Sequence, residues 1–140
     1  MTPEVDIATH LHGLSTLGVT YTLSTNMFYG PERPASTVAP VIPEECLFIC
    51  PIGGSAPQPY LNGGATSFYQ VTVQLTLRAA VQDFMAGLTK ARAILSALHS
   101  ATITGYTWCF AQNGDPVYIG PNAVGQPRWT LNFELAKVQA

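Results

Sequence analysis

Residues Ser67–His99 carry two hydrophobic periodicities, one directly after the other. From Tyr69 to Arg78 apolar and polar residues alternate, which predicts a strand with one apolar and one polar face. Apolar residues then recur at steps of four and three, the spacing of one face of an α-helix, at Phe84, Leu88, Ala91, Leu95 and Leu98, with Val81 and Met85 widening the stripe. The simplest way to bury both apolar surfaces is to fold the helix back onto the sheet.

The opposite side of this helix is small, because it carries Ala86, Ala93 and Ala97. Such a side either contacts a neighbour or faces solvent, and the small side chains favour contact. The composition points the same way. Only 10% of the residues are charged, against roughly 25% in an ordinary soluble domain. A folded monomer of this mass exposes about 7,000 Å². We therefore expect much of that surface to be buried against partners; the alternative is a neutral, poorly soluble monomer.

The length of 140 residues predicts a single domain, residues 1–140. A net charge of -2 argues against a protein that binds nucleic acid tightly, since phosphate binding needs clustered Lys and Arg. We expect no membrane segment, because no apolar run approaches the roughly 20 residues that span a bilayer. The acidic start Met1–Glu4 also argues against a secretory signal.

Three cysteines without paired spacing indicate reduced thiols in a cytosolic setting. Cys46 and Cys50 are expected to be core residues and not zinc ligands, and His10 and His12 do not share a helical face. We therefore expect no metal and no cofactor.

Before the central unit, the sequence predicts a helix over Thr2–Leu14, capped by the Thr2 hydroxyl, and a strand over Val19–Tyr29. Gly30–Glu45 contains four prolines and is expected to be an extended connection that covers a surface or crosses to a neighbour. Glu32 and Arg33 are expected to mark a solvated corner near its start. Cys46–Pro51 reads as a buried strand.

Gly53–Thr66 is rich in glycine and proline and is expected to form a long arm with Tyr60, Leu61 and Asn62 at its centre. It is not a phosphate-binding loop, because it neither ends in Gly-Lys-Ser/Thr nor opens into a helix. After the central helix, Tyr106–Ala111 predicts a strand, Asn113-Gly114 a hairpin turn, and Val117–Ile119 a returning edge strand. A second long two-faced strand is predicted over Arg128–Val138.

No catalytic pattern emerges from the polar residues. No Ser lies in a Gly-x-Ser-x-Gly elbow, and the adjacent Glu44 and Glu45 would point to opposite sides of a strand. Arg78 and Asp83 are expected to form a structural ion pair across the turn before the helix. The sequence thus favours a protein that is not an enzyme.

The order of elements, the stretch VTVQLTLRAAVQDFMAGLTKARAIL and the closing PRWTLNFEL resemble tail terminator proteins of long-tailed bacteriophages, also labelled minor capsid or tail completion proteins. The resemblance is best from Phe68 to Leu135. It implies a ring, commonly of six subunits, that caps the tail tube and offers the surface bound by the head-tail connector protein. It also implies a location in the tail or neck of the virion after assembly in the host cytoplasm, with DNA passing through without specific binding.

We therefore expect an α+β fold in which an antiparallel sheet is covered by two helices and carries a long glycine/proline-rich arm. Three alternatives remain: another head-tail joining or neck component (connector or stopper), a small-molecule or peptide-binding module with a pocket of Trp108, Tyr118 and Trp129, and a hydrolase with a dispersed site. The candidate subunit contacts are Phe28, Tyr29, Tyr60, Leu61 and Asn62.

Overall fold

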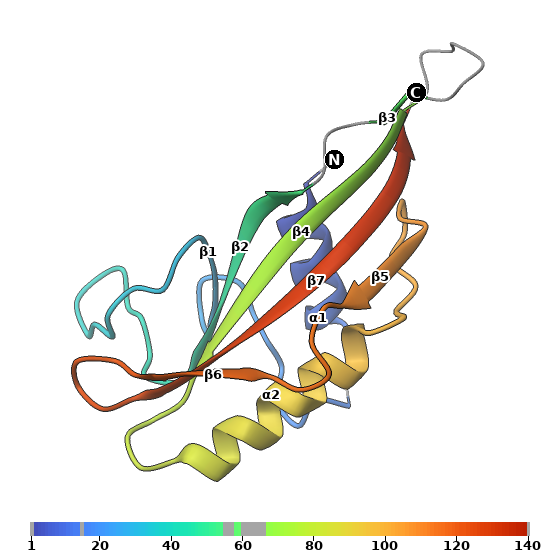
Figure 1. Cartoon of the computed structure of the whole chain (residues 1–140). Coiled ribbons are helices and arrows are strands. Elements are labelled where there is room, and N and C mark those ends of the chain that lie inside the picture. The colour runs from blue at the N-terminus through green and yellow to red at the C-terminus, as the bar shows by residue number, and fades with distance from the viewer. Residues whose placement is uncertain (1, 15, 55–57, 60–66, 140) are drawn as a thin grey trace.

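The computed structural model describes residues 2–14, 16–54, 58–59 and 67–139, which form two helices and one mixed sheet (Figure 1). The helices are α1 (Pro3–His12) and α2 (Phe84–Leu98). The strands are β1 (Met27–Tyr29), β2 (Cys46–Gly54), β3 (Gln58–Pro59), β4 (Ser67–Arg78), β5 (Trp108–Ala111), β6 (Val117–Pro121) and β7 (Pro127–Gln139). The α+β class, the central strand that runs into a helix, and the second long strand are confirmed.

The long antiparallel pair β4–β7 is the centre of the sheet, and it pairs from Ser67 opposite Gln139 to Arg78 opposite Arg128. The sheet order is β1-β2-β4-β7-β5, with β3 also against β4 and β6 also against β7. The expectation of a purely antiparallel sheet is wrong, because β1 runs parallel to β2. Residues 30–45 cause this arrangement, since they return the chain to the end of the sheet at which β1 began.

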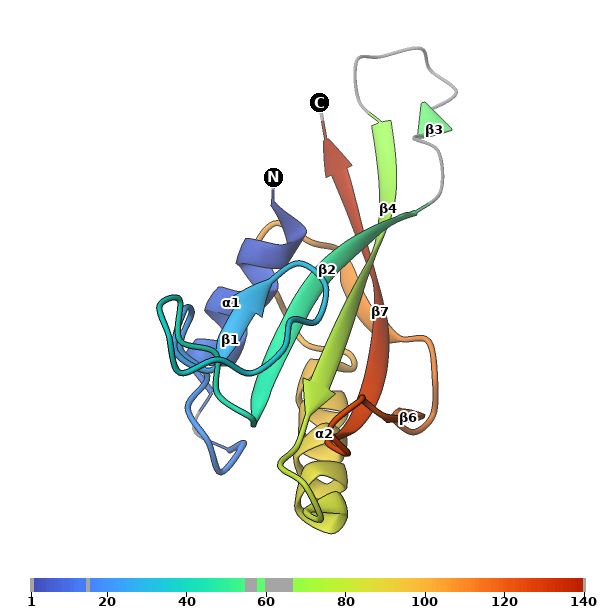
Figure 2. The same cartoon turned by 90° about the vertical axis from the view of Figure 1, so that its left-hand side faces the viewer.

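Both helices share one hydrophobic core with the apolar side chains of the long strands. α1 lies against β2, and α2 crosses the lower end of β7 (Figures 1 and 2). The buried face of α2 consists of Gly87, Ala91, Ile94 and Leu98. The predicted stripe is therefore displaced at its start, because Phe84, Met85 and Val81 are 40%, 67% and 47% exposed.

Gly87 explains this displacement of the α2 stripe. A Cβ atom there would lie 2.5 Å from Trp129 Cζ3 and 2.7 Å from Ala79 Cβ, so the helix backbone rests directly on the Trp129 ring. Phe84 lies at the rim, with its ring centroid 5.1 Å from that of Trp129.

The predicted first helix is present, but its cap is not as expected. Pro3 occupies the first turn of α1, while Thr2 makes no side-chain capping hydrogen bond. The predicted strand Val19–Tyr29 is wrong except for its last three residues. A turn replaces it, because Asn26 Oδ1 accepts a hydrogen bond from Thr22 N at 2.7 Å and Asn26 Nδ2 donates to Thr20 O. These side-chain hydrogen bonds satisfy backbone groups that would otherwise pair with a neighbouring strand.

The predicted hairpin at Asn113-Gly114 is also wrong. β5 and β6 both pair with the same strand, Ala111 lying opposite Phe133 and Val117 opposite Thr130. Residues 112–116 therefore interrupt one edge of the sheet and do not reverse the chain. The reversal follows at residues 122–126, where Asn122 Oδ1 accepts from the backbone N–H groups of Val124 and Gln126.

β2 continues to Gly54, beyond the predicted end at Pro51. The predicted arm over Gly53–Thr66 falls mostly outside the described residues, and so do Tyr60, Leu61 and Asn62.

Candidate interaction surface

Two arginines end the two central strands side by side. Arg78 of β4 and Arg128 of β7 are directly opposite in the antiparallel register. Two like charges at such a position repel each other. Glu32 lies between them: Arg78 Nη1 donates to its Oε2 at 3.3 Å, and Arg128 Nη1 donates to its Oε1 at 2.8 Å. The expected Arg78–Asp83 ion pair is therefore wrong, and Glu32 is not in a solvated corner.

Arg78 also holds the proline-rich segment against the sheet. Its side chain is fully buried and donates to the carbonyl oxygens of Arg33, Pro43 (2.8 Å) and Glu44 (2.9 Å). The guanidinium lies 5.4 Å from the centre of the Phe48 ring, a cation–π contact. Both ends of residues 33–44 are thus fixed to one side chain.

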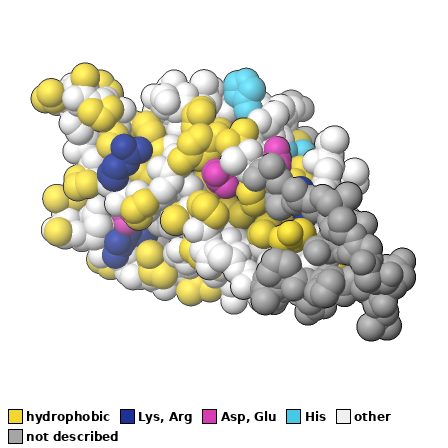
Figure 3. Space-filling model, turned by 90° about the horizontal axis from the view of Figure 1, so that it is seen from above, with side chains coloured by type: hydrophobic (Ala, Val, Ile, Leu, Met, Phe, Trp, Pro, Cys, Tyr) yellow, Lys and Arg dark blue, Asp and Glu magenta, His cyan; other side chains and the backbone are white. Residues whose placement is uncertain are grey.

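Between these fixed ends the chain projects from the body of the protein. We call residues 36–41 the apolar tip. Paired backbone hydrogen bonds of 2.8 and 2.9 Å between Ser36 and Ile42 close it, and buried Ile42 anchors it beside Phe28. Val38 is 73% exposed and Val41 56%. The tip lies at the left of Figure 1, and Figure 3 shows apolar side chains on the same projection.

Further apolar side chains are exposed close to the base of the tip. A groove of about 500 Å³ separates residues 32–35 from the β6–β7 turn. Val81 and Val124 line it and are 47% and 66% exposed. On β6 itself Val117, Tyr118 and Ile119 are each at least 40% exposed, and the Tyr118 ring meets that of Phe84 edge-on at 5.2 Å.

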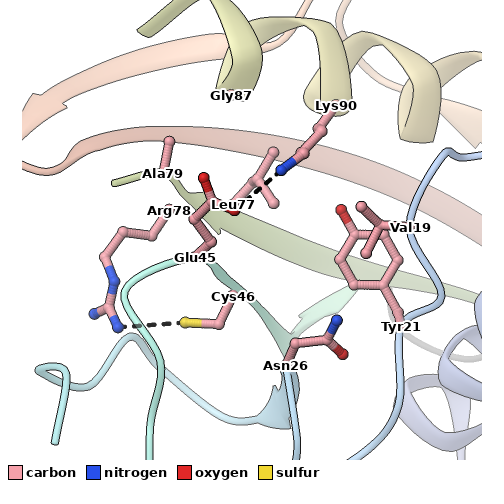
Figure 4. Close-up of a pocket in the computed structure, with 10 residues that line it drawn as sticks. All are labelled: Val19, Tyr21, Asn26, Glu45, Cys46, Leu77, Arg78, Ala79, Gly87 and Lys90. Atoms are coloured by element: carbon pink, nitrogen blue, oxygen red, sulfur yellow. Dashed lines mark hydrogen bonds and ion pairs between the residues drawn. The ribbon is translucent and has the colours of Figure 1, made fainter. Parts of the chain in front are cut away.

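A small pocket lies beneath α2 on the other side of Arg78 (Figure 4). Its volume is about 60 Å³, room for a few water molecules. The ion pair between Lys90 Nζ and Glu45 Oε2, 3.1 Å long, lies at this pocket. Burial raises the pKa of Tyr21 to about 12 and that of the Cys46 thiol to about 11, so both groups keep their protons at neutral pH. Neither is an activated nucleophile.

The aromatic pocket proposed for a binding module is not formed by the described residues. Trp129 is buried against Phe84 and Tyr118, whereas Trp108 stacks on Phe110 and packs against Phe68. Among the residues that the structure describes, no three potential metal ligands come together, and no helix is long and apolar enough to cross a membrane.

The candidate contact residues occupy different environments. Phe28 is buried, with its ring 5.8 Å from that of Phe48 and the Arg33 guanidinium over it. Tyr29 is half-buried and lines a groove of about 270 Å³ with Leu23 and His12. The sequence reasoning did not single out Val38 and Val41, although the absence of charge from Pro34 to Pro43 was a visible signal.

The described residues thus define an α+β protein whose distinctive features are apolar surfaces and not reactive groups. A family model for the bacteriophage tail terminator protein matches residues 19–139, and the chain belongs to this family. No curated protein matches the chain. Membership makes the protein a structural component of the phage tail, in a family of virion proteins not known as enzymes.

Proposed function

We propose that the chain forms a homo-oligomeric ring of six copies that caps the phage tail tube and presents the surface bound by the head-tail connector protein. Membership in the tail terminator family carries this proposal, and the exposed surface supports it. Large apolar side chains lie open at the apolar tip, at β6 and at the start of α2. The free energy falls when a neighbour covers exposed apolar side chains such as Val38 and Met85.

A closed ring needs two different contact surfaces on every copy, because each subunit meets its neighbours head to tail. The chain offers several separate apolar surfaces of this kind, including the β6 edge and the groove beside Tyr29. Tyr29 and Phe28, with Tyr60, Leu61 and Asn62 of the predicted arm, remain our candidates for subunit contacts.

The distribution of positive charge supports a channel through which DNA passes without specific binding. Of the six Lys and Arg residues, Arg78, Arg92, Arg128 and Lys90 are in ion pairs with acidic side chains. Such paired cations cannot neutralise many phosphates, and phosphate neutralisation is what holds DNA on a protein.

The test is electron microscopy of lysates from a phage that lacks this gene. A terminator predicts headless tails of uncontrolled length, and a plasmid copy of the wild-type gene should restore joined particles. Tails of normal length that fail to join heads would instead indicate another neck component, a connector or stopper. Infectious particles of normal appearance would contradict both roles.

A further inference from the structure

The apolar tip has the properties of a preformed docking element. It lies within Pro34–Pro43, a segment without any charged residue, and the Ser36–Ile42 backbone bonds and Arg78 fix its shape. A segment that is already ordered loses little conformational entropy on binding. Its exposed large apolar side chains are Val38 and Val41, so a partner for the tip must offer an uncharged surface with room for them.

The same chain carries such a surface elsewhere. A groove of about 420 Å³ runs between residues 17–19 and the first half of α2, and we call it the α2 groove. Its lining is Leu17, Gly18, Val19, Met85, Ala86, Thr89 and Lys90.

The walls of the α2 groove suit an apolar insert. No atom lies within 4 Å of the position that a Cβ atom of Gly18 would take, so this wall is open. Met85 is 67% exposed, and its unbranched side chain can adapt to a neighbour. The one charged lining residue, Lys90, is already paired with Glu45 and leaves no unmatched charge for an apolar partner.

We infer that the apolar tip of one copy inserts into the α2 groove of the next copy, an inference that rests on the proposed ring. The two surfaces are on different parts of one chain, so the contact is head to tail, as ring closure requires. The tip is uncharged, and the one charge of the groove, Lys90, is already paired with Glu45. A contact of ordinary size covers about 800 Å² on each partner. Two such contacts take only about a fifth of the 7390 Å² that one copy exposes.

Disulfide cross-linking on assembled tails tests this contact. In a Cys50→Ser background, Val38→Cys and Ala86→Cys are combined, and purified tails are oxidised and run on non-reducing gels. We expect a ladder of linked copies from the double variant and monomers from each single variant. Val38→Cys combined with Thr104→Cys is the matched control, because Thr104 is exposed but lies beside α1 and not in the α2 groove. A double variant that is present on tails but stays monomeric would overturn the inference.

A charge exchange gives a second test that does not depend on disulfide geometry. Val38→Asp and Ala86→Lys each place an unpaired charge in the contact, and each should lower the amount of protein on tails at least about tenfold. The two substitutions together should restore it. Incorporation of Val38→Asp at the wild-type level would overturn the inference while leaving the proposed ring intact. If the wild-type chain itself is absent from tails, the proposed function and the inference both fail.

Discussion

At the scale of single residues, Gly87 and Trp129 decide how closely α2 approaches the sheet. Trp129 is 1% exposed, and the backbone of α2 lies directly against its ring at Gly87. Glycine normally weakens a helix, so its presence here reflects the space required and not helix propensity. The substitution of this residue therefore separates the two effects.

Gly87→Ala should destabilise the protein by about 1–3 kcal/mol, because the new methyl group overlaps the Trp129 ring. Helix propensity alone predicts the opposite sign, a gain of about 1 kcal/mol. Urea unfolding monitored by Trp fluorescence measures the difference. Gly114→Ala is the control, since nothing lies within 4 Å of that position. A Gly87→Ala variant more stable than the wild type would show that the contact is not tight.

Arg78 is the second residue on which the shape of the protein depends. Arg78→Met leaves Glu32 with a single partner and removes the donors to Pro43 and Glu44. The loss of one member of a buried pair costs about 3–5 kcal/mol. We expect a loss of this size in urea unfolding, together with faster proteolysis within residues 33–44. Arg92→Met is the matched control, because the Arg92–Asp115 pair is exposed and the urea midpoint should not move. Equal midpoints for the two variants would contradict the role of Arg78.

At the scale of elements, a side-chain hydrogen bond joins α1 to the part of the chain that follows α2. The Tyr106 hydroxyl donates a hydrogen bond to Asp6 Oδ2 at 2.7 Å, and Ile7 and Leu11 of the same helix are fully buried in the core. Burial, followed by the Asp6 hydrogen bond, raises the pKa of Tyr106, so its hydroxyl remains a donor over the whole neutral range.

Tyr106→Phe should lower stability by about 1.5–3 kcal/mol, the net value of a hydrogen bond to a charged group. The loss should be concentrated in α1, where hydrogen exchange of the backbone amides should become faster than in β4 and β7. Tyr118→Phe serves for comparison, because that side chain is 46% exposed. Unchanged exchange in residues 3–12 would show that α1 is held by its apolar face alone.

The elements that were predicted well are those whose hydrophobic pattern continues over many residues. β4, α2 and β7 each repeat their pattern over ten or more residues, and the long strands needed only the alternation of apolar and polar side chains. The buried face at the start of α2 was predicted wrongly, because no periodicity reveals that Gly87 must lie on Trp129.

The surface elements were predicted less well, because contacts between distant residues decide them. The path of residues 30–45 depends on Arg78, which lies more than 30 residues further along the chain. The Asn26 side chain turns the first part of the predicted strand Val19–Tyr29 into a turn, and β6 joins β7 where Asn113-Gly114 alone predicted a hairpin. The candidate site was missed for the same reason: the exposure of Val38 and Val41 follows from the anchoring of residues 33 and 43.

At the scale of the whole molecule, two buried cysteine thiols make the stability of the fold decrease at alkaline pH. Burial raises the pKa of Cys109, and burial against the opposing effect of Arg78 raises that of Cys46, each from 9.0 to about 11. The unfolded chain loses these protons first, so their contribution to stability is complete below pH 9 and is lost as pH rises through about 11.

Stability should therefore fall by about 2 kcal/mol for each of the two thiols between pH 9 and pH 11. Urea unfolding at a series of pH values measures the decline. Cys109→Val cannot titrate and should make the decline shallower, whatever its own stability at neutral pH. An identical pH profile for the variant and the wild type would contradict the assignment.

The low charge of the chain also acts at this scale. With four of six cations in ion pairs and Val38, Met85 and Val124 open to solvent, the isolated subunit leaves much apolar surface uncovered. We propose that this surface is contact area for copies of the same chain and for neighbouring tail and head proteins.

The most direct test is a cryo-electron microscopy map of the intact virion at the junction of head and tail. We expect a closed ring of this chain on the head-proximal end of the tail tube, with Val38 of each copy covered by its neighbour. A map in which the chain is absent from the junction, or lies there as single copies with the apolar tip in solvent, would contradict it.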